Sequence, residues 1–201
     1  MQQQGLRLRR KGRKKLDKYI VYFKKYSEMY DFDWLAIAAQ AYQESRLDQS
    51  IVSHAGTIGI MQVLPSTAEY VGIKHIENAE NNIHAGVKYM HYLRKKFFND
   101  PEISKEAKFD FTLAAYNIGA SRVNKLRKKT EEMGLDKNKW FLNVENAALE
   151  KVGQEPVRYV GNINKYYIAF SLSVDELQKR EQEKNNFGDT TLNYHNLVTC
   201  S

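Results

Sequence analysis

Residues 42–62 read YQESRLDQSIVSHAGTIGIMQ and join the end of an apolar segment to a glycine-rich loop. The apolar segment, DFDWLAIAAQAYQES, is hydrophobic on most sides, which predicts a helix buried within the domain. Ile37, Ala41 and Glu44 share one face at helical spacing, so Glu44 continues an apolar surface. Burial and the negative end of the helix dipole raise a carboxyl pKa, and a general acid must be protonated near neutral pH. Judged alone, however, Glu44 is better interpreted as a helix-end residue that pairs with Arg46.

The loop after this helix has residues suited to the wall of a binding site. Gly56 and Gly59 permit a positive φ or a close approach of the backbone. Ser53 and Gln62 offer polar groups, and Met61 offers an apolar wall. An ordinary glycine loop between two helices has the same spacing, so these residues alone leave both interpretations open.

The composition indicates one mainly helical domain. Hydrophobic residues make up 42% of the 201 residues and aromatic residues 12%, and there are only three prolines. No apolar run approaches the roughly 20 residues that span a bilayer, and no signal-peptide pattern is present. The single cysteine, Cys200, cannot form an internal disulfide. His84 and His91 share one helix face, but the spacing places no further ligand beside them, so we expect no metal or other cofactor.

The net charge of +7 comes from one short segment. Residues 7–15, RLRRKGRKK, contain seven Lys or Arg and no acid, and the rest of the chain balances 24 basic against 24 acidic residues. We interpret this segment as a solvated linker. The alternative is attraction to an anionic surface such as nucleic acid, lipid head groups or cell-wall polymer. We expect no nucleic-acid partner, because the rest of the chain has no basic stripe interleaved with aromatic residues.

Helical spacing and capping residues divide the chain into segments. We expect a basic linker at 1–14, a folded domain at 15–173 and a polar tail at 174–201 that begins as helix and then becomes disordered. Helices are predicted at 15–29, from near Trp34 to Ser45, from Pro65, at 81–97 with Asn81 or Asn82 as cap, at 106–118 before Gly119, over the segment closed by Gly134, at 140–152 and from Pro156.

Four motifs in order resemble the SLT-type lytic transglycosylases, goose-lysozyme-like enzymes that cleave bacterial peptidoglycan. They cover roughly residues 16–172 and are the helix ending Glu44-Ser45, the loop SHAGTIGIMQ at 53–62, AAYNIG at 114–119 and EPVRYV at 155–160. The segments DWLAIAAQAYQES, NIHAGVKYM and WFLNVENAALEKVG look most like the membrane-bound lytic transglycosylase F type. The resemblance implies a mainly α, lysozyme-like (goose-type) helical domain with a substrate cleft.

The F type also implies a cellular context. Its catalytic domain follows an N-terminal domain of the periplasmic solute-binding sort. By that resemblance, residues 1–14 are the junction to such an upstream region, which carries the export signal. The protein is then expected in the periplasm or cell envelope, associated with the outer membrane through a region absent from this chain. Its expected partners are peptidoglycan glycan strands, and we expect a monomer.

The resemblance assigns site residues position by position. Glu44 matches the single catalytic acid of the family, and Ser53 matches the serine that helps to hold its carboxyl. The other matches are residues that contact the glycan or line its cleft: Met61, Gln62, Tyr116, Asn117 and Tyr159. The chain departs from the common pattern at Thr57-Ile58 and at Ala120-Ser121, and neither departure removes a chemical group that the mechanism needs.

The motifs supply one carboxylate, whereas ordinary glycosidases pair two. The implied reaction has Glu44 protonate the glycosidic oxygen between N-acetylmuramic acid and N-acetylglucosamine, then accept the proton of the muramoyl 6-hydroxyl, leaving a 1,6-anhydromuramoyl end. Two alternatives are a muramidase that hydrolyses the same bond and a non-catalytic glycan-binding module. The sequence leaves open a second reacting carboxylate among Asp48, Glu69, Asp110 and Glu155.

Overall fold

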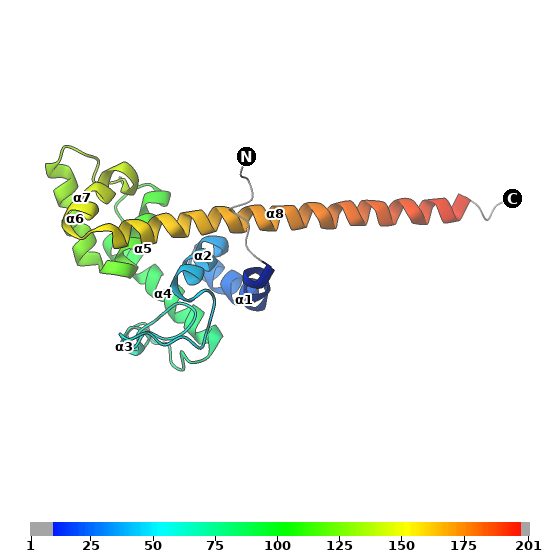
Figure 1. The fold of residues 1–201 in the computed structure, drawn as a ribbon, viewed down its shortest axis with the longest axis horizontal. Coiled ribbons are helices and arrows are strands. Elements are labelled where there is room, and N and C mark those ends of the chain that lie inside the picture. The colour runs from blue at the N-terminus through cyan, green and yellow to red at the C-terminus, as the bar shows by residue number, and fades with distance from the viewer. Residues whose placement is uncertain (1–9, 198–201) are drawn as a thin grey trace.

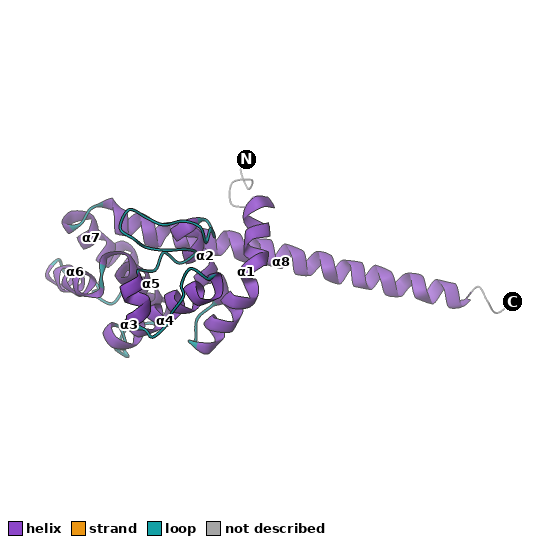
Figure 2. Cartoon of the chain, turned by 90° about the horizontal axis from the view of Figure 1, so that it is seen from below, coloured by secondary structure: helices purple, strands orange, loops and turns teal. Residues whose placement is uncertain are grey.

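The structure, a computed structural model, describes residues 10–197, with side chains from Lys14 to Glu176 and that of Lys179. This part of the chain is helical and forms no strand (Figures 1 and 2). A π-helical turn, η1 (Trp140–Val144), precedes α7, and no described helix has both the length and the apolar character to cross a membrane. The α-helices are α1 (Arg10–Met29), α2 (Trp34–Ser45), α3 (Pro65–Tyr70), α4 (Ala79–Phe97), α5 (Lys105–Ile118), α6 (Ala120–Glu132), α7 (Glu145–Lys151) and α8 (Gln154–Leu197).

Two helices extend beyond their predicted ends. α1 begins at Arg10 rather than at Lys15, and α8 continues to Leu197 through the segment predicted to become disordered. Both extensions contain many Lys, Arg, Glu and Gln residues, whose straight side chains lose little rotamer freedom in a helix. Gly12 and Gly188 do not end either helix. In Figure 1 the second half of α8 projects away from the helices that surround its first half.

The predicted end of α5 agrees with the structure, and the predicted cap of α4 does not. Asp33 caps α2 through its side chain, and Gly119 ends α5 with a φ of 87°. α4 is capped by Asn78, whose side-chain oxygen accepts two backbone N–H bonds, and not by Asn81 or Asn82. Asn82 is instead fully buried and serves the neighbouring loop.

The helix predicted at 140–152 is shorter than expected. Phe141, with a ψ of 136°, and Leu142, with a φ of 59°, leave the helical conformation, and α7 begins only at Glu145. The side chain of Glu145 accepts the backbone N–H of Leu142, and Asn146 donates to the carbonyl of Leu142. Trp140 anchors the turn in the core. Polar side chains thus satisfy the backbone groups that the missing helical turn would have paired.

α2 lies at the centre of the domain and packs against both α1 and α8 (Figure 1). Most of its buried side chains are small, and Ile37 is the largest hydrophobic one among them. Small side chains allow neighbouring helices to approach closely. α8 therefore lies directly along α2, and the two helices bring residues from opposite ends of the domain together.

Gly86 on α4 faces Met61, and this contact generates a stability prediction. A Cβ atom at Gly86 would lie 2.7 Å from Met61 Cβ and 2.8 Å from Met61 Cγ. We expect Gly86→Ala to lower the free energy of unfolding by about 1 kcal/mol, because overpacking costs 1–3 kcal/mol and the gain in helix propensity is about 1 kcal/mol.

Gly161→Ala on α8 is the matched control for this prediction. Nothing lies within 4 Å of a Cβ atom at Gly161, so this variant is expected to raise the free energy of unfolding by up to about 1 kcal/mol. Urea unfolding followed by circular dichroism measures both variants. A Gly86→Ala protein as stable as Gly161→Ala would show that the core at Met61 is loosely packed.

Candidate active site

Glu44 lies in the last turn of α2, where most of its side chain is removed from water. Burial raises the pKa of its carboxyl to about 7. The hydrogen bond from Tyr159 lowers this pKa, and the negative charge of Glu155 raises it, each by less than burial does. A carboxyl with a pKa near 7 is populated in both forms at neutral pH, so it can donate a proton and also accept one.

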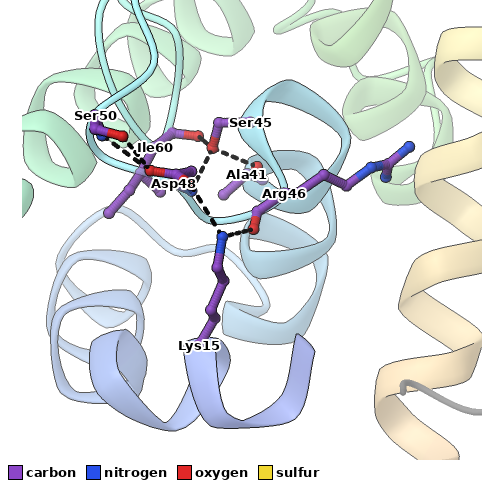
Figure 3. Close-up of polar contacts among 7 residues, drawn as sticks. All are labelled: Lys15, Ala41, Ser45, Arg46, Asp48, Ser50 and Ile60. Carbon is purple, nitrogen blue, oxygen red and sulfur yellow. Dashed lines mark hydrogen bonds and ion pairs between the residues drawn. The ribbon is translucent and has the colours of Figure 1, made fainter. Parts of the chain in front are cut away.

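Arg46 does not pair with Glu44, which corrects the interpretation favoured from the sequence alone. Its backbone turns into the left-handed region, with a φ of 57°, and one guanidinium nitrogen donates to the carbonyl of Tyr42. The guanidinium lies 4.7 Å from the ring centroid of Tyr42 and 5.1 Å from that of Tyr166, in cation–π geometry. In Figure 3 the Arg46 side chain extends toward α8. Among the described side chains, no cation forms an ion pair with Glu44.

A small polar cluster fastens the end of α2 to α1 and to the following loop (Figure 3). Ser45, which follows Glu44, donates to the carbonyl of Ile60 at 2.8 Å and accepts the backbone N–H of Asp48 at 3.1 Å. Lys15 on α1 donates to Asp48 Oδ2 at 3.2 Å and to a backbone carbonyl at the end of α2 at 3.3 Å. These bonds fix the direction in which the chain leaves the helix, and so the position of Glu44.

Tyr159, near the start of α8, is the hydrogen-bond partner of the Glu44 carboxyl. Its hydroxyl donates to Glu44 Oε1 at 2.5 Å and accepts from Gln40 Nε2 at 3.4 Å. Gln40 is fully buried on α2, and its Oε1 atom has no partner within the described residues. The phenol therefore bridges two side chains of α2, and its O–H stabilises the charged form of the carboxyl.

Buried Asn82 on α4 holds the loop between α2 and α3. Its Oδ1 accepts the backbone N–H of Met61 at 2.8 Å, and its Nδ2 donates to the carbonyl of Ile58 at 2.8 Å. At Gly59, where φ is 76°, a Cβ atom would lie 2.7 Å from Asn82 Nδ2, so the close approach requires glycine. The sequence indicates Asn82 only as a helix cap, and its position beside the buried stripe of α4 is the signal for its role in holding the loop.

The loop brings Ser53 and Gln62 together through Thr57. Thr57 Oγ1 lies 2.7 Å from both Ser53 Oγ and Gln62 Oε1, and Gln62 Nε2 donates to a loop carbonyl at 2.8 Å. Thr57 is one of the residues where the sequence departs from the common family pattern. No hydrogen bond joins Ser53 to Glu44 within the described part of the chain, so its support of the carboxyl stays a prediction.

Met61 occupies the core and not the surface of a cleft. Its side chain is 0% exposed and lies against Gly86, which leaves it no surface for direct contact with a glycan in this structure. Its backbone carbonyl accepts the Tyr116 hydroxyl at 2.7 Å. Met61 therefore anchors the loop from inside, and its predicted contact with the substrate stays a prediction.

Tyr116 and Asn117 at the end of α5 complete the surroundings of Glu44. Burial, and then the charge of Glu44, raise the pKa of Tyr116. Asn117 Nδ2 donates to Glu155 Oε1 at 2.6 Å, whereas the buried Oδ1 of Asn117 has no partner among the described residues. An unpaired buried acceptor is rare in folded proteins, so Asn117 Oδ1 lacks a partner that most such atoms have.

The four carboxylates that the sequence leaves open as a second reacting group differ in their surroundings and in their position relative to Glu44. Glu155 is the one whose charge affects the pKa of Glu44. Asp48 is tied to Ser50 and Lys15, and Glu69 is exposed on α3. Asp110, whose pKa burial raises to about 6, lines a separate cavity of about 440 Å³ near the N-terminal end of α2, opposite to Glu44.

The two histidines of α4 pack against aromatic rings. His84 stacks on Tyr26 with ring centroids 4.2 Å apart, and His91 lies 5.2 Å from the ring of Tyr30. No group of three or more His, Cys, Asp or Glu side chains that could hold a metal ion is found among the described residues.

The raised pKa of Glu44 generates a prediction about stability and pH. Between about pH 4.5 and pH 7 the folded state binds a proton that the unfolded state releases, so stability is lost as the pH rises through this window. Glu44→Gln does not titrate. We expect it to gain stability relative to the wild type over this range, on the order of 2–3 kcal/mol, since one pKa unit corresponds to about 1.4 kcal/mol. Urea unfolding across the window measures the difference, and Glu69→Gln is the exposed control. A difference that stays constant with pH would contradict the raised pKa.

Replacing Tyr159 isolates the effect of its hydroxyl. Tyr159→Phe removes a bond that favours the carboxylate, so we expect the pKa of Glu44 to rise above its wild-type value. Tyr167→Phe, also on α8, removes a hydroxyl that donates to Asp33 and should leave Glu44 unchanged. A carboxyl-carbon NMR titration reads the pKa directly. An unchanged or lower pKa of Glu44 in Tyr159→Phe would refute the assigned hydrogen bond.

The fold is shared with lytic transglycosylases of known structure. Lytic transglycosylase Slt from Pseudomonas aeruginosa, solved as an inactive mutant, matches with a TM-score of 0.60 and 20% identity over 78% of this chain and 24% of that chain. The 70 kDa soluble lytic transglycosylase from Escherichia coli matches with a TM-score of 0.60 and 24% identity over the same shares. These likenesses concern the fold alone, and they confirm the mainly α, lysozyme-like architecture predicted from the motifs.

The sequence of this chain is similar to those of curated relatives. Membrane-bound lytic murein transglycosylase F from Pseudomonas fluorescens Pf-5 is 32% identical over 168 residues, 76% of this chain and 34% of the relative. The protein of the same name from Haemophilus influenzae PittEE is 36% identical over 165 residues, 75% of this chain and 33% of the relative. This chain thus spans about a third of the length of these relatives. The family model described as "Transglycosylase SLT domain" matches residues 21–141, and the chain belongs to this family.

Proposed function

We propose that this chain is a peptidoglycan lytic transglycosylase that cleaves the β-1,4 bond between N-acetylmuramic acid and N-acetylglucosamine. The observation that carries the proposal is the state of Glu44, a partly buried carboxyl with a pKa of about 7 that accepts a hydrogen bond from Tyr159 and pairs with no described cation. The relatives, of which this chain spans about a third, are named lytic murein transglycosylases.

In the proposed reaction Glu44 serves both steps. Protonated Glu44 gives its proton to the glycosidic oxygen, and the bond from that oxygen to muramoyl C1 breaks. The positive charge that develops at C1 is stabilised by the sugar's own N-acetyl group. The muramoyl 6-hydroxyl oxygen then bonds to C1, and its proton goes to the Glu44 carboxylate, which restores the acid. The product is a 1,6-anhydromuramoyl end, and no water is consumed.

The neighbours of Glu44 have distinct parts in this scheme. Tyr159 donates to the carboxylate that exists between the two steps. Asn117, a partly exposed residue bonded to Glu155, is assigned contact with the glycan. Tyr116 holds the loop through the Met61 carbonyl, and the Ser53–Thr57–Gln62 group shapes the loop surface.

A muramidase that hydrolyses the same bond is the second candidate, because Glu155 is a carboxylate near Glu44. Hydrolysis with two carboxylates needs a base that activates water. Glu155, however, accepts the amide of Asn117 and raises the pKa of Glu44. We therefore assign Glu155 a part in tuning Glu44 and favour the reaction that needs one acid.

The cellular setting follows from the same proposal. We propose that the protein acts at the bacterial cell envelope, in the periplasm, because the proposed substrate is found there. The relatives are named membrane-bound lytic murein transglycosylases, and their greater length leaves room for an upstream solute-binding-type domain that associates with the outer membrane and regulates the site. We propose that the domain acts as a monomer.

Digestion of purified murein tests the proposed reaction. We expect the wild type to release muropeptides with 1,6-anhydro ends, which mass spectrometry identifies because they are one water lighter than hydrolysis products. Glu44→Gln should lower the rate at least roughly 10²-fold, the lower end of what general acid–base groups contribute. Glu69→Gln on α3 is the control and should digest murein at the wild-type rate.

Each other outcome points to a different function. Hydrated ends from the wild type, lost in Glu155→Gln, would favour the muramidase. Binding of murein without release of fragments, unchanged in Glu44→Gln, would favour a non-catalytic glycan-binding module. Either result would refute the proposed transglycosylase.

A further inference from the structure

A row of tyrosines leads away from the surroundings of Glu44 along one side of the domain. It begins with Tyr116 on α5, whose ring centroid lies 5.6 Å from that of Tyr89 on α4. Tyr89 and Tyr92 are one helical turn apart, nearly parallel and 6.1 Å apart. Tyr70, the last residue of α3, meets Tyr92 edge-on at 5.1 Å. Three helices thus contribute to one continuous aromatic row.

The outer part of the row is open to solvent. Tyr70 is 62% exposed, and it lines two adjoining hollows together with Tyr92. One hollow, of about 420 Å³, is bordered by Phe97 and by residues 119–121, directly after the motif that contains Asn117. Isolated exposed aromatic residues are common, but several that share a hollow indicate a binding surface.

Lysines give the outer end of the row a positive charge. The second hollow, of about 770 Å³, is lined by Lys88, Lys95 and Lys96 as well as by Tyr70 and Tyr92. Lys96 Nζ lies 5.3 Å from the ring centroid of Tyr92. A partner for this surface therefore combines flat apolar faces with negative charges.

We propose that the row from Tyr89 to Tyr70 is a remote saccharide site, which binds distal units of the same glycan strand that Glu44 cleaves. The apolar C–H faces of pyranose rings stack on aromatic side chains, and the lysines pair with carboxylates carried by the strand. Continuity argues for this occupant: the first hollow is bordered by residues 119–121, which directly follow the motif that contains Asn117. The inference rests on the proposed function, because it assigns a second contact to the same substrate.

Only a long glycan strand can reach both Glu44 and the remote site, so the test compares strands of different length. We compare the wild type with the double variant Tyr70→Ala/Tyr92→Ala on short and long uncrosslinked glycan strands. The ratio of kcat/KM on long strands to that on short strands should fall roughly tenfold in the double variant, which corresponds to about 1.4 kcal/mol. The fall should appear in KM, because the lost contacts bind the strand without touching the reacting bond. The double variant Tyr70→Phe/Tyr92→Phe keeps both aromatic rings, so its ratio should equal that of the wild type.

Phe141→Ala is the matched control, because Phe141 is also an exposed aromatic residue and lies outside the row, in η1. It should leave the ratio at the wild-type value. A double variant that is folded by circular dichroism and retains the wild-type ratio overturns the remote site. An equal loss of ratio in Phe141→Ala also overturns it, because the effect would then not be specific to the row.

A binding measurement separates failure of this inference from failure of the proposed function. Long glycan strands are titrated into Glu44→Gln protein with and without the Tyr70→Ala/Tyr92→Ala changes, and the expected result is roughly tenfold weaker binding with them. If the wild type releases no anhydro products but this difference is found, the proposed reaction fails and the glycan site stands. If anhydro products form but the affinities are equal, the remote site alone is refuted.

Discussion

The hydrogen bond from Tyr159 to Glu44 joins the last turn of α2 to the start of α8, and the candidate active site depends on it. The two residues are separated by 115 positions, so the bond forms only when α8 packs along α2. Burial favours the neutral carboxyl, whereas the phenol favours the charged one. Their opposition leaves the pKa at about 7, so the acidity of Glu44 is a property of helix packing and not of the local sequence.

A second constraint is that the loop after α2 has almost no regular structure and must be held by polar groups. The Ser45 hydroxyl accepts the backbone N–H of Asp48 and donates to the carbonyl of Ile60, which lie near the two ends of the loop. The buried side chain of Asn82 forms hydrogen bonds with the backbone on either side of Gly59. An unpaired buried polar group costs about 1–3 kcal/mol. Loop conformations that leave the Asn82 side chain without its hydrogen bonds are therefore disfavoured. The same rigidity explains why Met61 faces inward, because its backbone N–H and carbonyl are both bonded there.

The sequence predicted features that depend on local patterns, and it did not predict features that depend on distant partners. Helical spacing located most helices and placed Glu44 on an apolar face, and the motif order indicated the family. The predicted pairing of Arg46 with Glu44 is wrong because the guanidinium lies between the rings of Tyr42 and Tyr166, and Tyr166 belongs to α8, far away in the sequence. Asn82 resembled a helix cap because its partners lie in another loop. The irregular turn at Leu142 likewise has no signature in helical periodicity.

The proposed reaction uses one carboxylate, and the surroundings of Glu44 bear on that choice. A hydrolytic pair needs an acid and a base whose environments push their pKa values apart. Here the charge of Glu155 and the bond from Tyr159 act on a single group in opposite directions, and they leave Glu44 able to give a proton and take one back. The carboxylate of Glu155 already accepts a hydrogen bond from the side-chain amide of Asn117. These contacts support the proposed reaction, in which one side chain acts as acid and then as base, over the activation of water by a second residue.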